Sequence, residues 1–218
     1  AARALYEFIW DEFCDWYVEL TKPRLYRGTP AERATAQHVL VTVLRGTLEL
    51  LHPFMPFITE AIWQHLPHAG ETIALAPWPA SVPARRDPEA EAAMTLVMEV
   101  TRAVRHIRSE MNIPSSSRAA VILVCPDTAS RAVLERWGDY IETLALAELE
   151  VFPELASEPR QAAHAVAGGV EIYVPLAGLI DTEKETVRLA RQLADVEKDL
   201  ARVEAKLANP GFLAKAPP

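Results

Sequence analysis

Cysteine is nearly absent from the sequence, since Cys14 and Cys125 are the only two in 218 residues. They lie far apart, without a C-x-x-C motif or a nearby histidine pair, so neither a disulfide framework nor a zinc site is supported. A signal-peptide pattern is also missing, and no apolar run approaches the ~18 residues that a membrane-spanning helix needs. These absences predict a cytoplasmic protein. The sequence starts with alanine inside an apparent helix, so we expect a fragment of a longer protein.

The sequence also lacks the excess of basic residues that a protein coating nucleic-acid phosphates needs. It has 22 lysines and arginines against 30 aspartates and glutamates, a formal net charge of -8. The acid is concentrated between residues 119 and 178, which hold 3 basic and 9 acidic side chains. Any contact with RNA must therefore be local.

No residue pattern indicates a catalytic centre. The six histidines show neither metal-ligand spacing nor a motif with serine or cysteine. Asp11 and Asp15 could form an acid/base pair, but their spacing is more typical of a charged or salt-bridged helix surface. Gly168 and Gly169 lack the downstream lysine of a phosphate-binding loop, so they predict a turn. We expect no catalytic residue, no metal and no cofactor in this chain.

A helical bundle is predicted for residues 1–114. The first helix, from Leu5 to Leu20, is so rich in aromatic residues that we expect it to be buried, and Pro23 should end it. The second has a capping box at Thr29 and Glu32. A third helix is predicted for 57–66, and a fourth begins at Asp87, ends before Pro114 and buries Met94, Val97, Thr101, Val104, Ile107 and Met111.

A small α/β subdomain is predicted for residues 115–180. Short apolar runs with β-branched residues predict strands, and Gly168-Gly169 predicts a hairpin turn between the last two. The predicted strands are 119–124, 149–152, 161–167 and 170–174, with a helix ending near Leu146 after the first.

Residues 181–218 predict the first arm of a coiled coil. A second capping box, Thr182 with Glu185, begins a helix that Asn209 and Pro210 should end. Its apolar residues alternate in steps of four and three, the spacing of a coiled-coil seam. The seam consists of Leu189, Leu193, Val196, Leu200, Val203 and Leu207.

Basic residues gather on two helices. The outer side of the arm could follow an RNA backbone or be a solvated helix surface, and its cations are Lys184, Arg188, Arg191, Lys198 and Arg202. On the fourth helix, Arg102, Arg105 and Arg108 recur every three residues. They could contact RNA, or they could pair with acidic residues of the first helix, namely Glu7, Asp11, Asp15 and Glu19. The residues alone leave both alternatives open.

Four segments resemble the C-terminal region of bacterial valyl-tRNA synthetases. Two of them are LYEFIWDEFCDWY at 5–17 and LHPFMPFITE at 51–60, of which the leucyl and isoleucyl families share a looser version. The more discriminating pair is GGVEIYVPLAGLID at 168–181 and, beyond the heptad helix, NPGFLAKAP at 209–217. The resemblance covers nearly the whole chain, although Ala61 replaces the acidic residue expected after Glu60.

The resemblance implies an anticodon-binding helical bundle, a small α/β subdomain and a C-terminal coiled coil that reaches the outer corner of the tRNA. Unstacked bases suit aromatic and arginine planes, and phosphates suit cations. The implied anticodon contacts are Phe8, Lys22, Arg24, Glu71, Arg102, Arg105 and Arg108. Phe8 has an alternative role in the core, because an aromatic residue at helical spacing usually packs inward.

The same resemblance places ATP-dependent valylation, and its ATP and magnesium, in upstream domains, because the His-Ile-Gly-His and Lys-Met-Ser-Lys-Ser signatures are absent here. The return helix of the coiled coil is also missing, so we expect an exposed seam and self-association through it. Two alternatives remain: a protein-interaction or oligomerisation module, and the equivalent region of a leucyl or isoleucyl enzyme.

Overall fold

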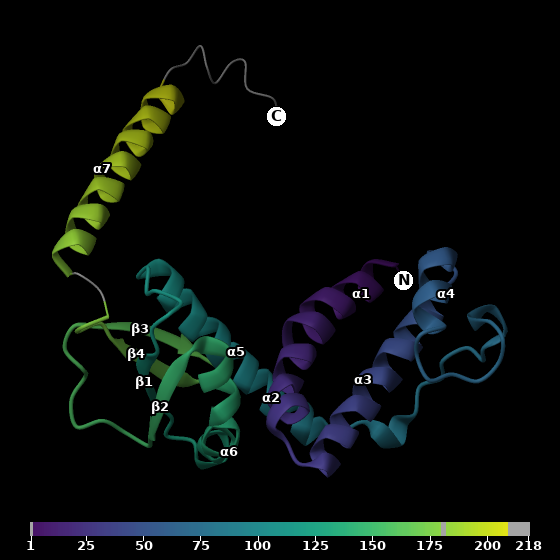
Figure 1. The fold of residues 1–218 in the computed structure, drawn as a ribbon. Helices are drawn as coiled ribbons and strands as arrows, with labels where there is room; N and C mark the ends of the chain where they lie inside the picture. The colour runs from purple at the N-terminus through teal and green to yellow at the C-terminus, as the bar shows by residue number, and fades with distance from the viewer. Residues whose placement is uncertain (1, 180–181, 209–218) are drawn as a thin grey trace. The chain divides into compact units, whose positions relative to one another are not determined.

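The structure, a computed structural model, describes residues 2–179 and 182–208 (Figure 1). The chain is mainly helical with one four-stranded sheet, in agreement with the predicted fold class. Its contacts divide it into two compact units, Ala1–Glu91 and Ala92–Pro218, which we describe separately.

The first unit begins with a continuous helical segment that consists of α1 (Ala2–Glu7), the π-helical η1 (Phe8–Val18) and α2 (Glu19–Arg27). The prediction that this segment ends before Pro23 is wrong, because the helix continues through the proline. Proline removes one backbone donor, but Leu20 and Thr21 are buried on the same turn, so packing outweighs that loss.

The segment is buried on one face only. Phe13 and Trp16 are 8% and 6% exposed, whereas Tyr6 and Trp10 are 62% and 53% exposed. The expectation of a fully buried first helix is therefore corrected: two of its six aromatic side chains, Tyr6 and Trp10, are exposed.

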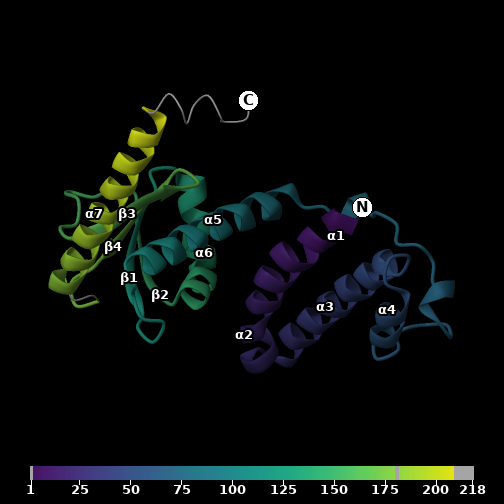
Figure 2. The same cartoon turned by 90° about the horizontal axis from the view of Figure 1, so that it is seen from above.

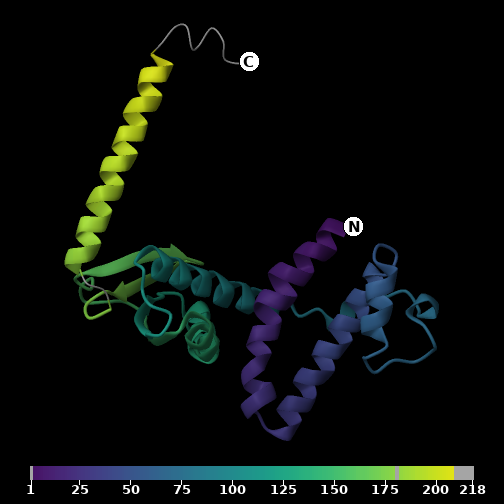
Figure 3. The ribbon, with the colours of Figure 1, turned by 45° about the horizontal axis from the view of Figure 1, so that its top comes forward.

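The next helix, α3 (Pro30–Leu51), begins at the predicted capping box. The Thr29 hydroxyl accepts from the Glu32 backbone N–H at 3.3 Å, and the Glu32 carboxylate accepts from the Thr29 backbone N–H at 2.8 Å. Helices α2 and α3 pack together beside the turn that joins them (Figure 3). A short helix, α4 (Pro56–Trp63), and the 3-10 turns η2 (Ile73–Leu75) and η3 (Pro83–Arg85) complete the unit.

The second unit places α5 (Pro88–Glu110) against the sheet. We predicted that this helix closes a bundle with the first three helices. Its predicted apolar face is indeed buried, but Val97, Val100, Val104 and Ile107 share one core with the strands and with α6 (Thr128–Ala145). The two compact units divide between Glu91 and Ala92, after the first turn of α5.

All four predicted strands are present, in the order β2-β1-β4-β3. Their bounds are β1 Ala119–Val124, β2 Ala147–Phe152, β3 Ala162–Ala167 and β4 Val170–Pro175. Parallel β1 and β2 are connected through α6, and β3 and β4 form the predicted hairpin (Figure 2).

The hairpin turn needs glycine for two reasons. Gly168 and Gly169 have φ angles of 58° and 75°, in the left-handed region that glycine adopts without strain. Space is also limiting, because a Cβ on Gly168 would lie 2.5 Å from Cδ1 of Leu96 in α5. The turn therefore packs directly against α5, the helix that covers the sheet.

The last helix, α7 (Thr182–Leu207), confirms the long helix predicted near the C-terminus. The predicted capping-box side chains, Thr182 and Glu185, and the predicted stop at Asn209 lie outside the described residues, as does the side chain of Leu189. The other five seam residues are between 48% and 64% exposed. No helix in the described ranges is long and apolar enough to cross a membrane.

Candidate nucleic-acid interface

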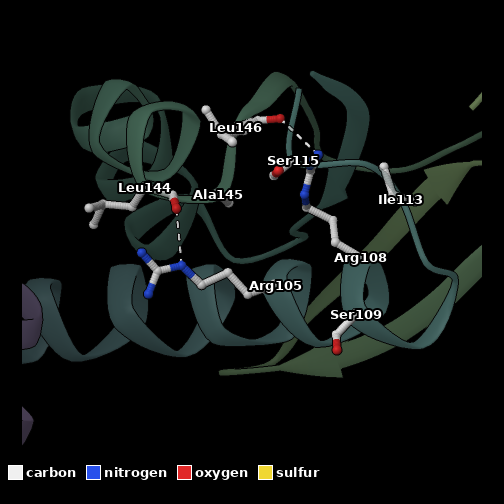
Figure 4. A pocket seen from close by; sticks show the side chains of 8 residues that line it. All are labelled: Arg105, Arg108, Ser109, Ile113, Ser115, Leu144, Ala145 and Leu146. Carbon is white, nitrogen blue, oxygen red and sulfur yellow. Dashed lines mark hydrogen bonds between the residues drawn. The ribbon is translucent and has the colours of Figure 1, made fainter. Parts of the chain in front are cut away.

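Arg108 is buried and fully engaged with the backbone. It is 8% exposed, and burial lowers the pKa of its guanidinium. Its Nη1 donates to the Leu146 carbonyl at 3.0 Å (Figure 4). Its Nη2 donates to the carbonyls of Pro114 and Ser117 at 2.9 Å each. These bonds satisfy the carbonyl at the end of α6 and two carbonyls of the loop after α5, so the geometry argues against the RNA contact predicted for Arg108.

Arg105 lies one turn earlier in α5 and is exposed. Its Nε donates to the Leu144 carbonyl at 3.0 Å. With Arg108 and Ser109 it lines a shallow hollow of about 220 Å³ between the ends of α5 and α6 (Figure 4). Arg102 is exposed on the same helix and also has an interaction partner. The arginines predicted as one row thus differ sharply in burial.

The acidic residues of the first helix have short-range partners of their own. The Glu7 carboxylate is 2.7 Å from Nε of Arg3, and the Glu19 carboxylate is 2.6 Å from Nζ of Lys22. Both pairs are formed within one or two turns of the same helical segment. Glu7 and Glu19 therefore already have cationic partners on their own helical segment. The salt-bridge alternative had paired both of them with the arginines of α5.

Three further candidates lie on or near the first helical segment. Lys22 is exposed and paired with Glu19. Arg24 is half-buried, and its Nε is buried without a hydrogen-bond partner among the described residues. Phe8 is also half-buried, with its ring stacked 6.4 Å from that of Phe13. Phe8 therefore combines the core packing and the partial exposure that its two alternative roles require.

Glu71 is exposed on a loop whose backbone is tightly held. The Glu60 carboxylate accepts from the Thr72 hydroxyl at 2.6 Å and from the Ile73 backbone N–H at 3.0 Å. Gln64 donates both to Glu60 at 2.6 Å and to the Glu71 carbonyl at 2.7 Å. Hydrogen bonds from Gln64, Thr72 and Ile73 lower the pKa of the Glu60 carboxyl. The Glu71 side chain is thus presented from a fixed backbone.

Sequence analysis missed this role of Glu60. Its partners Thr72 and Ile73 lie 12 and 13 residues further along, across a proline-rich segment with no periodicity. Only the four-residue spacing to Gln64 was a usable signal, because residues four apart meet on one helix face.

The cations of α7 are mostly solvent-facing. Arg191 and Lys198 are exposed, and Arg202 pairs with Asp199 at 3.1 Å while both side chains remain 67% exposed. Arg188 differs, because its Nη2 donates to the carbonyl of Glu110 at 3.0 Å. The side chain of Lys184 lies outside the described residues. An exposed cation near a partly compensating carboxylate can still bind a phosphate.

Metal chemistry has no visible basis in the part of the chain that the structure describes, where no three His, Cys, Asp or Glu side chains are grouped to hold an ion. Cys125 is buried in the core, and burial raises the pKa of its thiol. A raised pKa favours the unreactive thiol over the thiolate.

Two protein families match the chain. Residues 1–123 match the family described as the anticodon-binding domain of tRNA ligase. Residues 181–218 match the family described as the valyl tRNA synthetase tRNA binding arm.

Curated relatives match this chain over nearly all of its own length. The chain is 54% identical over 217 residues to the valine–tRNA ligase of Carboxydothermus hydrogenoformans and 48% identical over 220 residues to that of Geobacter sulfurreducens. It is 43% identical over 215 residues to that of Bacillus subtilis. These alignments cover 100%, 100% and 99% of this chain but 24%, 25% and 24% of the relatives, so the chain spans about a quarter of their length.

Proposed function

The chain belongs to the family of anticodon-binding domains of tRNA ligases, and we propose that it is the tRNA-binding part of a valine–tRNA ligase. The observation that carries the proposal is the presence of two family matches on one chain, an anticodon-binding domain and a valyl-specific tRNA-binding arm. Three relatives that match the whole chain are also named valine–tRNA ligases. The leucyl and isoleucyl alternative is not favoured.

For the anticodon stem and loop we propose contacts from the accessible candidates of α1 to α5. Phe8 offers a partly exposed ring for stacking, and Glu71 offers a carboxylate on a fixed loop that can accept from a base amino group. The proposed cations are Lys22, Arg24, Arg102 and Arg105. Arg108 is left out, because its donors already bind backbone carbonyls.

For the outer corner of the tRNA we propose contacts from α7. Its outward cations, Arg191, Lys198 and Arg202, need only be positioned near phosphates, because backbone contacts carry no sequence information. Lys184 and Arg188 belong to the same proposed set. The arm would therefore add affinity, and the anticodon contacts would add specificity.

We assign no catalytic step to this chain. Valylation, with its ATP and magnesium, is proposed for the portion of such a ligase that this chain does not include. The role left for these residues is to hold the tRNA in register, since a correctly positioned substrate lowers the entropic cost of the reaction elsewhere.

The exposed seam of α7 supports a second candidate function, a helical interaction module. Leu193, Val196 and Leu200 are 60%, 64% and 56% exposed, an apolar stripe that water disfavours. A partner helix or a second copy of the chain would cover it. Sedimentation over a range of chain concentrations tests self-association, and a purely monomeric profile at the highest concentration would count against it.

Binding of unmodified valine tRNA to the 218-residue chain tests the main proposal. We expect affinity to fall steeply with salt, with a slope of roughly 0.7 to 0.9 per neutralised phosphate. Nuclease footprints should cover the anticodon loop and the outer corner. Equal protection of an unrelated tRNA, or no salt dependence, would contradict the proposal.

A further inference from the structure

The carbonyl of Glu110, the last residue of α5, cannot accept the usual helical hydrogen bond. Its donor would be the backbone N–H of residue 114, which is a proline and has none. The amides of Met111, Asn112 and Ile113 already donate to earlier carbonyls of the same helix. Asn112 has a φ of 49°, so the backbone turns away directly after α5. The Glu110 carbonyl is therefore open to a donor from another element.

Arg188 of α7 supplies that donor. Its Nη2 donates to the Glu110 carbonyl at 3.0 Å, across 78 residues of sequence. Charge favours this contact as well, because the C-terminal end of a helix carries partial negative charge. Arg188 is half-buried, whereas every other α7 side chain that the structure describes is exposed. Arg188 thus ties α7 to the end of α5.

The end of α5 to which Arg188 binds is well packed. On its last turns, Val104 is fully buried and Ile107 is 2% exposed. Arg108, two residues before Glu110, donates to two carbonyls of the loop that follows the helix. The bond from Arg188 therefore attaches α7 to a part of the second unit that is itself held in place.

The cations proposed for the outer corner of the tRNA lie beyond this bond along α7. Arg202 follows Arg188 at a distance of about 21 Å along the helix, at the helical rise of about 1.5 Å per residue. A tilt of α7 by about 10° at Arg188 would move Arg202 by about 4 Å, more than the length of a hydrogen bond. Small changes at Arg188 are therefore amplified at the cations that follow it.

We propose that Arg188 is a positioning residue, whose bond to the Glu110 carbonyl sets the direction of α7 before tRNA binds. This inference rests on the proposed function, in which Arg188 belongs to the cations of the arm. Its contribution there is to aim the cations further along the helix, and it binds no phosphate itself. An arm that is already held in its bound direction lowers the ordering cost of association.

The distance between two spin labels reports the direction of α7 in the 218-residue chain without tRNA. The labels are attached through Ala132→Cys in α6 and Ala201→Cys in α7, both at exposed positions. Cys14→Ser removes the partly exposed native thiol. Cys125 stays, because it is buried and its raised pKa favours the unreactive thiol. A chain that carries Cys14→Ser alone is the labelling blank.

The unsubstituted arm should give one narrow distance peak, and Arg188→Ala should broaden it. Arg191→Ala is the matched control, because Arg191 is an exposed arginine within one turn of Arg188. It should leave the peak unchanged.

Binding of valine tRNA separates positioning from phosphate contact. Arg188→Ala should weaken binding by about three- to tenfold, as expected for the loss of one hydrogen bond. Its salt slope should stay that of the unsubstituted chain, because the bound arm still reaches the same phosphates. Arg191→Ala should instead reduce the slope by about 0.7 to 0.9.

Two outcomes overturn the inference. One is a distance distribution of equal width in the unsubstituted chain and in Arg188→Ala. The other is a salt slope that falls in Arg188→Ala as much as in Arg191→Ala, which would make Arg188 a phosphate contact. Either result with normal tRNA binding by the unsubstituted chain refutes this inference alone, whereas no tRNA binding by that chain refutes the proposed function.

Discussion

The guanidinium of Arg108 and the carbonyl oxygen of Leu146 are joined by a hydrogen bond of 3.0 Å across 38 residues of sequence. Leu146 has a φ of 51°, the left-handed conformation that ends α6. The Arg108 side chain also donates to the carbonyls of Pro114 and Ser117, so this one residue holds the end of α6 and the loop after α5. Arg108 is therefore a structural residue of the second unit.

Arg108→Ala should destabilise the second unit by about 3 kcal/mol, because it leaves three backbone carbonyls without their charged donor. Urea unfolding followed by circular dichroism measures the loss. Arg105→Ala is the matched control, since Arg105 is exposed and donates from its Nε to the Leu144 carbonyl, and it should cost under about 1 kcal/mol. An Arg108→Ala variant of normal stability but weakened tRNA affinity would instead make Arg108 an RNA contact.

The Glu60 carboxylate predicts an acid-sensitive loop. Its pKa is lowered from 4.5 by hydrogen bonds from Gln64, Thr72 and Ile73, so it stabilises the fold when ionised. That stabilisation is present above about pH 4.5 and is lost as the pH falls through the lowered folded-state value. The protection factors of the amides of residues 71–76, measured against the intrinsic exchange rate at each pH, should fall in acid.

Glu60→Gln separates this effect from general acid unfolding. The variant should show low protection factors at residues 71–76 already at neutral pH, and these protection factors should depend less on pH than those of the unsubstituted chain. Glu71→Gln is the control, because the Glu71 side chain is exposed and only its carbonyl is held. Equal acid sensitivity in both variants would show that another group titrates.

The capping box of α3 predicts a measurable stability loss. Thr29→Ala removes the hydroxyl that accepts from the Glu32 backbone N–H, which should cost about 1 kcal/mol. Thr35→Ala serves as the control on the same helix, because its hydroxyl bonds the Ala31 carbonyl inside the helix and alanine is a better helix former. The measurement is the thermal unfolding midpoint of each variant. Equal midpoints for Thr29→Ala and Thr35→Ala would mean that the cap does not contribute to stability.

Charge reversal on α7 tests the arm. Arg191→Glu and Lys198→Glu together should weaken tRNA binding about tenfold or more at low salt and reduce the salt slope by roughly 1 to 2. Arg160→Glu is the control, because it reverses one exposed charge of the second unit outside α7. Filter binding across salt concentrations provides the readout, and an equal effect of all reversals would point to net charge alone.

Local signals in the sequence predicted the elements well. Thr29 with Glu32 located the start of α3, and Gly168-Gly169 located the hairpin, because each signal acts through neighbouring backbone groups. The apolar residues of α5 were also assigned correctly to a buried face. The surface that these residues pack against was not predicted correctly, since periodicity identifies a buried face but does not identify the element that covers it.

The candidate site was less predictable for the same physical reason. Arg102, Arg105 and Arg108 look alike in sequence, yet Arg108 is buried and the other two are exposed. Their difference depends on carbonyls supplied by residues 114–117 and 144–146, which only the tertiary fold brings near. Pro23 likewise looked like a helix end because the local rule does not include the burial of its neighbours.

The contact between Gly168 and Leu96 has a consequence for how such chains can vary. A Cβ on residue 168 would lie 2.5 Å from Cδ1 of Leu96, so the end of that flexible side chain would have to shift. The positive φ of Gly168 also strains any residue other than glycine at this position. Glycine should therefore be kept at position 168 whatever residue stands at position 96.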